Sequence, residues 1–87
     1  MSYRIIFEKK VFKDLDLLSP ADCDRVRDIV WSLVEEPRPS GCQKMRGFAD
    51  VYRIRMGRYR LVYQIVEADK AVRVFRVAHR KDVYRNL

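Results

Sequence analysis

The chain has 87 residues and a net charge of +7; 48% of its residues are hydrophobic and 36% are charged. One hydrophobic core is feasible at this length, whereas intrinsic disorder, fibrous repeats and a membrane-spanning helix are excluded, because the apolar share is ordinary and no apolar run reaches about 18 residues. The first residues enter a strand-like pattern without the apolar stretch of a signal peptide, so we expect a single cytoplasmic domain over residues 1–87.

The first half of the chain predicts a strand and two helices. Residues 3–7 indicate a short strand, with Tyr3, Ile5 and Phe7 on one face. Residues 8–18 have apolar side chains every three to four positions, which predicts a short amphipathic helix. Ser19 and Pro20 are typical of a helix N-cap and first helical position, so a second helix should cover residues 20–36. The tight turn between the helices predicts an antiparallel hairpin.

The second half of the chain is strand-like almost to its end. Gly57 and Arg58 are typical of a two-residue hairpin turn with glycine at its first central position. The candidate strands are residues 43–46, 50–56, 59–67 and 71–78. The order β-α-α-β-β-β predicts an α+β fold, in which the N-terminal strand and the helical hairpin pack with a mostly antiparallel four-stranded sheet.

The turn at Gly57 fixes which residues share a face of the sheet. Alternation places an apolar set toward the core, namely Tyr52, Ile54, Met56, Tyr59, Leu61, Tyr63 and Ile65. The opposite face then carries Arg53, Arg55 and Arg60, with Arg55 directly across from Arg60. Opposed like charges destabilise a strand pair, and residues 51–64 contain no acid to relieve them. We interpret this face as an anion site rather than an ordinary solvated surface.

The basic charge is segregated along the chain. Residues 1–43 carry 7 basic and 8 acidic side chains, whereas residues 44–87 carry 12 basic and 4 acidic ones, and 9 of those 12 are arginine. Solubility alone requires neither segregation nor arginine. Because the planar guanidinium matches phosphate oxygens and stacks on bases, the pattern favours a polyanion partner, above all nucleic acid.

The cysteine and histidine content argues against a metal centre. Cys23 and Cys42 do not form a C-x-x-C motif, and the chain has one histidine. Two cysteines cannot make a disulfide framework, and a zinc site would need unusual carboxylate ligands. We therefore expect reduced, structural cysteines, no metal and no cofactor.

The C-terminal run offers groups for metal-free RNA cleavage. His79 and Tyr84 can transfer protons, and Arg80 can neutralise a phosphorane. Each has an ordinary alternative: an edge histidine or a tyrosine that packs the tail or stacks on a base. This run alone does not decide between them.

Two segments together resemble a known family. Val51–Gln64 (VYRIRMGRYRLVYQ) is similar to the central hairpin, and His79–Tyr84 (HRKDVY) to the C-terminal motif, of the RelE branch of the RelE/ParE toxin superfamily. The Lys44–Gly47 segment also fits. The resemblance implies a type II toxin that cleaves messenger RNA in the ribosomal A site without a metal. Its functional residues would map onto Arg53, Arg55, Arg60, Arg80 and Tyr84, with His79 beside them and Lys44 and Arg46 as further RNA contacts.

The resemblance also implies partners and alternatives. A cognate antitoxin should carry an apolar helix or strand together with acidic residues near the arginines. The ribosome and messenger RNA would be targets, operator DNA would be reached only through the toxin–antitoxin complex, and no membrane is involved. The alternatives are a ParE-like inhibitor of DNA gyrase and a non-enzymatic RNA- or ribosome-binding protein.

One departure concerns the general base. Some RelE proteins have lysine where this chain has Arg53 and Arg55, and arginine is a poor base because it stays protonated. His79 has a suitable ordinary pKa, near 6.5, and Tyr84 is the fallback. In an unbroken strand His79 and Arg80 would point to opposite faces, so strand geometry is expected to decide whether His79 reaches the arginines.

Overall fold

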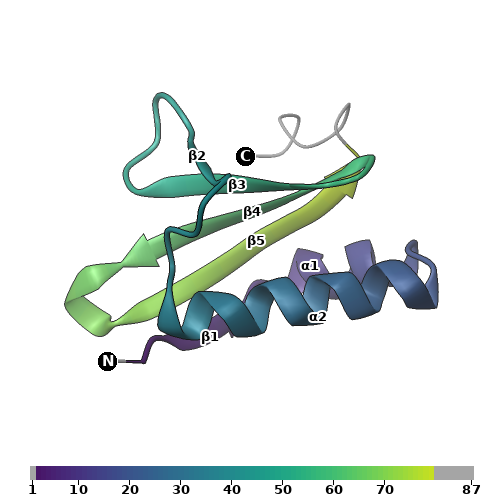
Figure 1. Cartoon of the computed structure of the whole chain (residues 1–87), viewed down its shortest axis with the longest axis horizontal. Coiled ribbons are helices and arrows are strands. Elements are labelled where there is room, and N and C mark those ends of the chain that lie inside the picture. The colour runs from purple at the N-terminus through teal and green to yellow at the C-terminus, as the bar shows by residue number, and fades with distance from the viewer. Residues whose placement is uncertain (1, 80–87) are drawn as a thin grey trace.

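A five-stranded sheet forms the centre of the protein in the computed structural model, which describes residues 2–79 (Figure 1). The spatial order is β1-β5-β4-β3-β2, with β1 parallel to β5 and the other pairs antiparallel. The strands are β1 (Arg4–Phe7), β2 (Gln43–Lys44), β3 (Val51–Met56), β4 (Tyr59–Val66) and β5 (Ala71–His79). The α+β fold with a mostly antiparallel sheet is confirmed. The sheet has five strands rather than the predicted four, because β1 joins it beside β5 and the two-residue β2, within the candidate strand at residues 43–46, pairs with β3.

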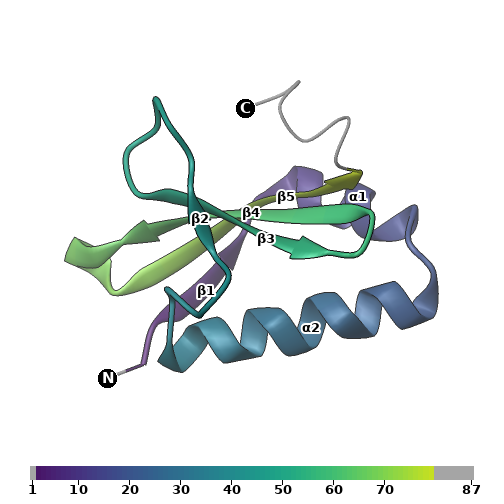
Figure 2. The ribbon, with the colours of Figure 1, turned by 45° about the horizontal axis from the view of Figure 1, so that its top comes forward.

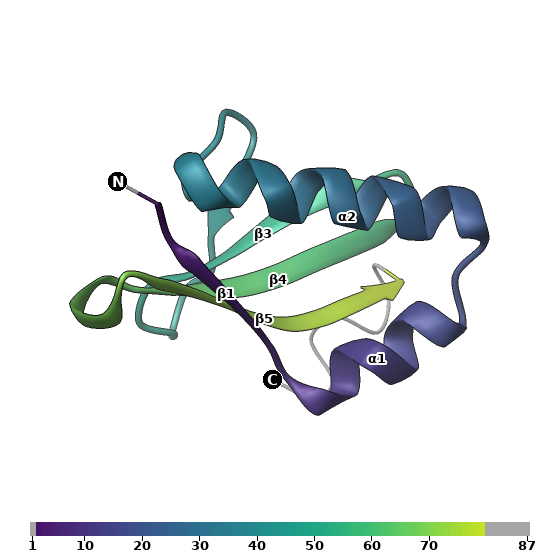
Figure 3. The ribbon, with the colours of Figure 1, turned by 90° about the horizontal axis from the view of Figure 1, so that it is seen from below.

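Both helices lie on the same face of the sheet (Figure 1). Helix α1 (Lys9–Asp16) runs along β5, whereas α2 (Pro20–Glu35) crosses the sheet separately from it (Figure 3). The Ser19 side chain caps α2 by accepting a hydrogen bond of 3.1 Å from the Asp22 amide, as the sequence predicted. The helices are splayed rather than closely paired, and both contribute to one core.

The main core lies between the helices and the sheet. Its buried members are Val11, Val26, Val30, Leu33, Met56, Leu61, Tyr63, Ile65, Val72, Val74 and Val77. Tyr63 is fully buried, and its hydroxyl donates a 2.7 Å hydrogen bond to the Pro37 carbonyl. Burial raises the pKa of Tyr63 well above its usual value, so the phenol stays neutral and serves as a fixed donor. This bond ties the segment after α2 to the centre of the sheet.

A β-bulge interrupts the pairing of β4 with β5. Val62 pairs with Arg76 and Tyr63 with Val74, so Phe75 is the extra residue. Val74 and Val77 both enter the main core although they are three positions apart, which a regular strand does not allow. The bulge therefore leaves two consecutive side chains, Phe75 and Arg76, outside that core.

A nearly buried ion pair joins β5 to α1. The Asp14 carboxylate accepts hydrogen bonds from Arg76 Nε at 3.0 Å and Nη2 at 3.2 Å, and from the Val77 amide at 2.9 Å. The two side chains are only 10% and 11% exposed. This contact was not predicted, because in the sequence Asp14 is only a polar residue of an amphipathic helix. The Asp14–Arg76 ion pair fixes the end of β5 that precedes the C-terminal motif.

Within residues 2–79, no helix has both the length and the apolar content that crossing a bilayer requires.

We expect Asp14→Ala to lower the free energy of unfolding by about 3 kcal/mol, because it leaves a buried guanidinium and a backbone amide without their acceptor. Asp16→Ala removes an exposed carboxylate from the same helix and should change the free energy by less than about 0.5 kcal/mol. Urea unfolding followed by circular dichroism measures both. Equal losses in the two variants would contradict a structural role for the Asp14 pair.

Candidate functional site

The central hairpin has the register that the sequence predicted. Arg55 pairs with Arg60 across β3 and β4, and Arg53 pairs with Val62. Gly57 has a φ of +60° at the first central position of the turn, where glycine adopts this conformation without strain. The face opposite the helices, here called the open face, therefore carries Arg53, Arg55 and Arg60.

The open face is more apolar than three arginines suggest. A second cluster of buried residues lies on it, formed by Met45, Val51, Val62 and Ala78 with Phe75 packed against them. The loop between β2 and β3 stands off the sheet on this side (Figure 2). This cluster lowers the local dielectric around any charge placed within it, which strengthens attraction to an anion.

Arg60 lies beside this apolar cluster. It is only 8% exposed, and its strand neighbours on the open face are Arg55 and Ala78. Its Nη1 is 3.5 Å from the Tyr59 carbonyl oxygen, at the limit of hydrogen bonding. Arg55, by contrast, is exposed. This pair concentrates positive charge on the open face, which favours an anionic ligand.

Arg53 lies at the β2 end of the open face with the other predicted RNA contacts. Its guanidinium donates hydrogen bonds to Gln43 Oε1 from Nε at 3.0 Å and Nη2 at 2.6 Å, which orients it. Lys44, Arg46 and Arg53 line one pocket of about 370 Å³, together with Met45 and Phe48. Three of the four predicted RNA-contacting residues therefore share a single cavity.

His79 lies on the other side of the sheet. It pairs with Tyr59, and the two rings meet edge-on with their centroids 6.1 Å apart. Because directly paired residues point to the same face, His79 accompanies Tyr59 toward the helices while Arg60 points to the open face. The structure does not bring His79 together with the arginines. Arg80 and Tyr84 lie outside the described residues.

Two side chains at this site were not predicted from the sequence. Phe48 is 42% exposed and lines the pocket that holds Lys44, Arg46 and Arg53. The signal for it was an aromatic residue directly after Gly47 in a basic loop. Gln43, which orients Arg53, was read only as part of a candidate strand. Oriented guanidinium groups beside an exposed ring suit a single-stranded nucleic acid, which presents phosphates and bases together.

Comparison with known proteins identifies the family. The model of the family described as "ParE toxin of type II toxin-antitoxin system, parDE" matches residues 5–84. The chain belongs to this toxin family. Its fold is therefore that of a type II toxin, as the resemblance implied.

The relatives place the toxin in the RelE branch of the superfamily. Toxin RelG of Mycobacterium tuberculosis is 34% identical over 98% of this chain and 99% of its own length. The mRNA interferase toxin RelE of Escherichia coli is 29% identical over 93% of this chain and 86% of its own length. The archaeal RelE–RelB complex of Pyrococcus horikoshii contains a chain with a TM-score of 0.79 and 30% identity, covering 92% of this chain and 97% of that one.

Because Arg60 is nearly buried, its truncation should lower the stability of the protein. We expect Arg60→Ala to lower the free energy of unfolding by about 1–2 kcal/mol, because the buried stem fills space beside the apolar cluster. Arg60→Met keeps the stem volume, so it should be less destabilising than Arg60→Ala. Arg55→Ala, at an exposed position, should be close to neutral.

Chemical denaturation of the three variants measures these differences. If Arg60→Met were as unstable as Arg60→Ala, the loss would come from the charge rather than from the stem, and the packing role assigned to the stem would be wrong.

Proposed function

We propose that this toxin is a metal-independent endoribonuclease that cleaves messenger RNA in the ribosomal A site and so inhibits translation. The observation that carries the proposal is Arg60, a nearly buried guanidinium on the open face directly opposite a second arginine. The relatives add support, because one of them is an mRNA interferase toxin. A guanidinium held beside apolar side chains and a second arginine is well placed to stabilise negative charge that develops on a phosphate.

The arginines have two roles in this proposal. Arg60 and Arg80 neutralise the charge that develops on the scissile phosphate, where a pre-oriented cation in a low dielectric is most effective. Arg53 and Arg55 bind the flanking backbone, since residues two apart on a strand are about 6.5–7 Å apart, close to the phosphate repeat of an extended single strand. Lys44 and Arg46 continue the same path through the pocket beside Phe48.

Proton transfer is assigned to the C-terminal motif rather than to the hairpin. Arg53 and Arg55 stay protonated and cannot accept the proton of the 2′-hydroxyl. His79 lies against Tyr59 on the helix side, so it would have to leave that contact to act at Arg60. We therefore assign proton transfer to Tyr84, aided by groups of the ribosome, and treat His79 as a packing residue.

An antitoxin is the second partner in this proposal. A relative has been solved as a RelE–RelB complex. On this chain, an apolar groove of about 320 Å³ lies between β1 and the helices and is bordered by Phe7, Leu15, Val30 and Trp31. Trp31 and Phe7 are large exposed apolar side chains, which suits the apolar segment of an antitoxin. Its acidic residues would cover the arginines, and operator DNA would be bound only by the complex.

Inhibition of DNA gyrase is the competing function within the same family. It requires a binding surface but no catalytic set, so truncating Arg60 would affect it no more than truncating other surface cations. The family description, which names ParE, is the observation that keeps this alternative open. Loss of DNA supercoiling activity on addition of the toxin would select it.

We expect primer extension on a translated messenger to show cleavage only when ribosomes and toxin are both present. Arg60→Met and Arg55→Ala should each lower cleavage by at least about 100-fold while the proteins stay folded. Arg27→Ala is the matched control, because it removes one exposed arginine from α2 on the helix side and should leave cleavage unchanged. Full cleavage by both open-face variants would contradict the proposed site.

The role of His79 has its own test in single-turnover cleavage at several pH values. We expect His79→Gln to stay within about tenfold of the parent with the same pH profile, whereas Tyr84→Phe should fall by about 100-fold or more. If His79→Gln instead lost about 100-fold or more, together with a pH dependence centred near the histidine pKa, His79 would be the base.

A further inference from the structure

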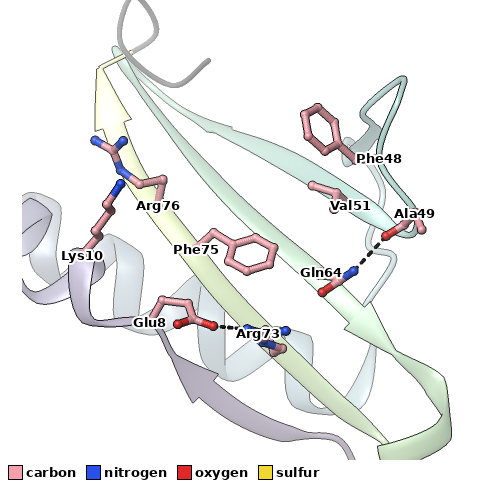
Figure 4. A pocket seen from close by; sticks show the side chains of 9 residues that line it. All are labelled: Glu8, Lys10, Phe48, Ala49, Val51, Gln64, Arg73, Phe75 and Arg76. Carbon is pink, nitrogen blue, oxygen red and sulfur yellow. Dashed lines mark hydrogen bonds and ion pairs between the residues drawn. The ribbon is translucent and has the colours of Figure 1, made fainter. Parts of the chain in front are cut away.

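A second pocket lies on the open face, on the far side of Phe48 from the arginine hairpin. It has a volume of about 480 Å³, a size typical of small-ligand sites. Figure 4 shows side chains from α1, β3, β4, β5 and the β2–β3 loop around it. They are Glu8, Lys10, Phe48, Ala49, Val51, Gln64, Arg73, Phe75 and Arg76. Apart from Phe48, which also lines the cavity of Lys44, Arg46 and Arg53, none of these residues has a role in the proposed cleavage site.

Two aromatic rings stand on either side of this pocket. Phe48 extends from the loop and Phe75 from the bulge of β5, with Val51 between them on the sheet (Figure 4). Phe75 is held in place, because the Arg73 guanidinium lies 5.2 Å from its ring centroid and is itself ion-paired with Glu8. A flat ligand can therefore contact one fixed ring and one exposed ring.

One polar group in the pocket is already oriented. Gln64 Nε2 donates a 3.0 Å hydrogen bond to the Ala49 carbonyl, which fixes the direction of the amide. Its Oε1 then points toward Phe75 and Arg73 (Figure 4). An oriented acceptor beside an aromatic ring suits a planar ligand with an amino or imide N–H at its edge, which describes a nucleobase.

The net charge at the rim is positive, which suits RNA. Lys10, Arg73 and Arg76 border the pocket together with Glu8. Arg73 is ion-paired with Glu8 and Arg76 with Asp14, which leaves the exposed Lys10 as the positive charge at the rim. The pocket is also continuous with the arginine face, because Phe48 lines both it and the cavity of Lys44, Arg46 and Arg53.

We propose that this pocket binds one base of the RNA, stacked against Phe48 and Phe75, while the strand backbone continues to the arginines. The inference rests on the proposed function insofar as RNA is the substrate, and it adds a base-contacting subsite away from the scissile phosphate. Stacking accepts any base, whereas the Gln64 oxygen favours a base that donates a hydrogen bond at its edge.

The experiment is abasic scanning of a short single-stranded RNA in the absence of ribosomes. Fluorescence anisotropy gives the Kd of the full-length toxin for the intact RNA and for versions that lack the base at one position each. We expect one position to matter most, with a loss of about fivefold to 100-fold. Phe48→Leu keeps the apolar bulk and removes the ring, so it should weaken binding of the intact RNA and abolish this positional sensitivity.

Phe12→Leu is the matched control, because Phe12 is an exposed aromatic side chain on α1, outside the pocket, and its replacement should leave the scan unchanged. Phe48 is itself 42% exposed, so its variant should fold, which circular dichroism checks. Gln64→Glu keeps an acceptor and adds charge beside the RNA, and should weaken binding of intact RNA.

Two results would overturn the inference. In one, Phe48→Leu keeps the positional sensitivity of the parent. In the other, it leaves RNA binding unchanged but weakens antitoxin binding, which would assign the pocket to an antitoxin side chain. Cleavage of ribosome-bound messenger by the parent protein is measured in parallel. Its absence would contradict the proposed function, whereas its presence together with an unchanged scan would contradict the subsite alone.

Discussion

The bulge at Phe75 is the constraint on which the two faces of this molecule depend. By adding one residue to β5, it lets Val74 and Val77 both enter the main core and sends Phe75 and Arg76 away from it. Arg76 thereby reaches the Asp14 carboxylate on α1, and Phe75 becomes part of the open face. Beyond the bulge the alternation is inverted, which is why His79 accompanies Tyr59 toward the helices.

The open face combines features that stability alone would not favour. A nearly buried arginine lies opposite another arginine and next to Val62, with no acid on the hairpin to pair with either. Elsewhere the same chain places an acid beside a buried arginine, since Asp14 accepts two hydrogen bonds from Arg76. On the hairpin, by contrast, the register sets two arginines opposite each other. Departures from local stability rules of this kind mark functional sites.

Much of the architecture could be predicted from short-range signals. Gly57 fixed the hairpin register, and Ser19 with Pro20 fixed the start of α2, because each acts through its own backbone geometry. The bulge was harder to predict from the sequence. The only sign of it is the change in spacing from Val72 and Val74 to Val77, and an irregular strand end could produce the same spacing. The Asp14 contact depends on how α1 lies along β5, and the apolar cluster beside Arg60 joins residues of β3, β4 and β5 with Met45 of the loop after β2. Neither can be read from spacing within one segment.

The division of the molecule into a charged face and an apolar groove bears on how one antitoxin could silence it. The groove beside Trp31 lies on the helix side, away from the open-face arginines. Apolar contact in the groove supplies binding free energy that does not depend on salt, whereas acidic residues over the arginines compete directly with RNA phosphates. A partner that uses both surfaces is bound through the apolar groove and blocks the arginines. Ribosomal RNA, which competes only for the arginines, would therefore not displace it. Release of the toxin would then require removal of the antitoxin itself rather than an excess of RNA.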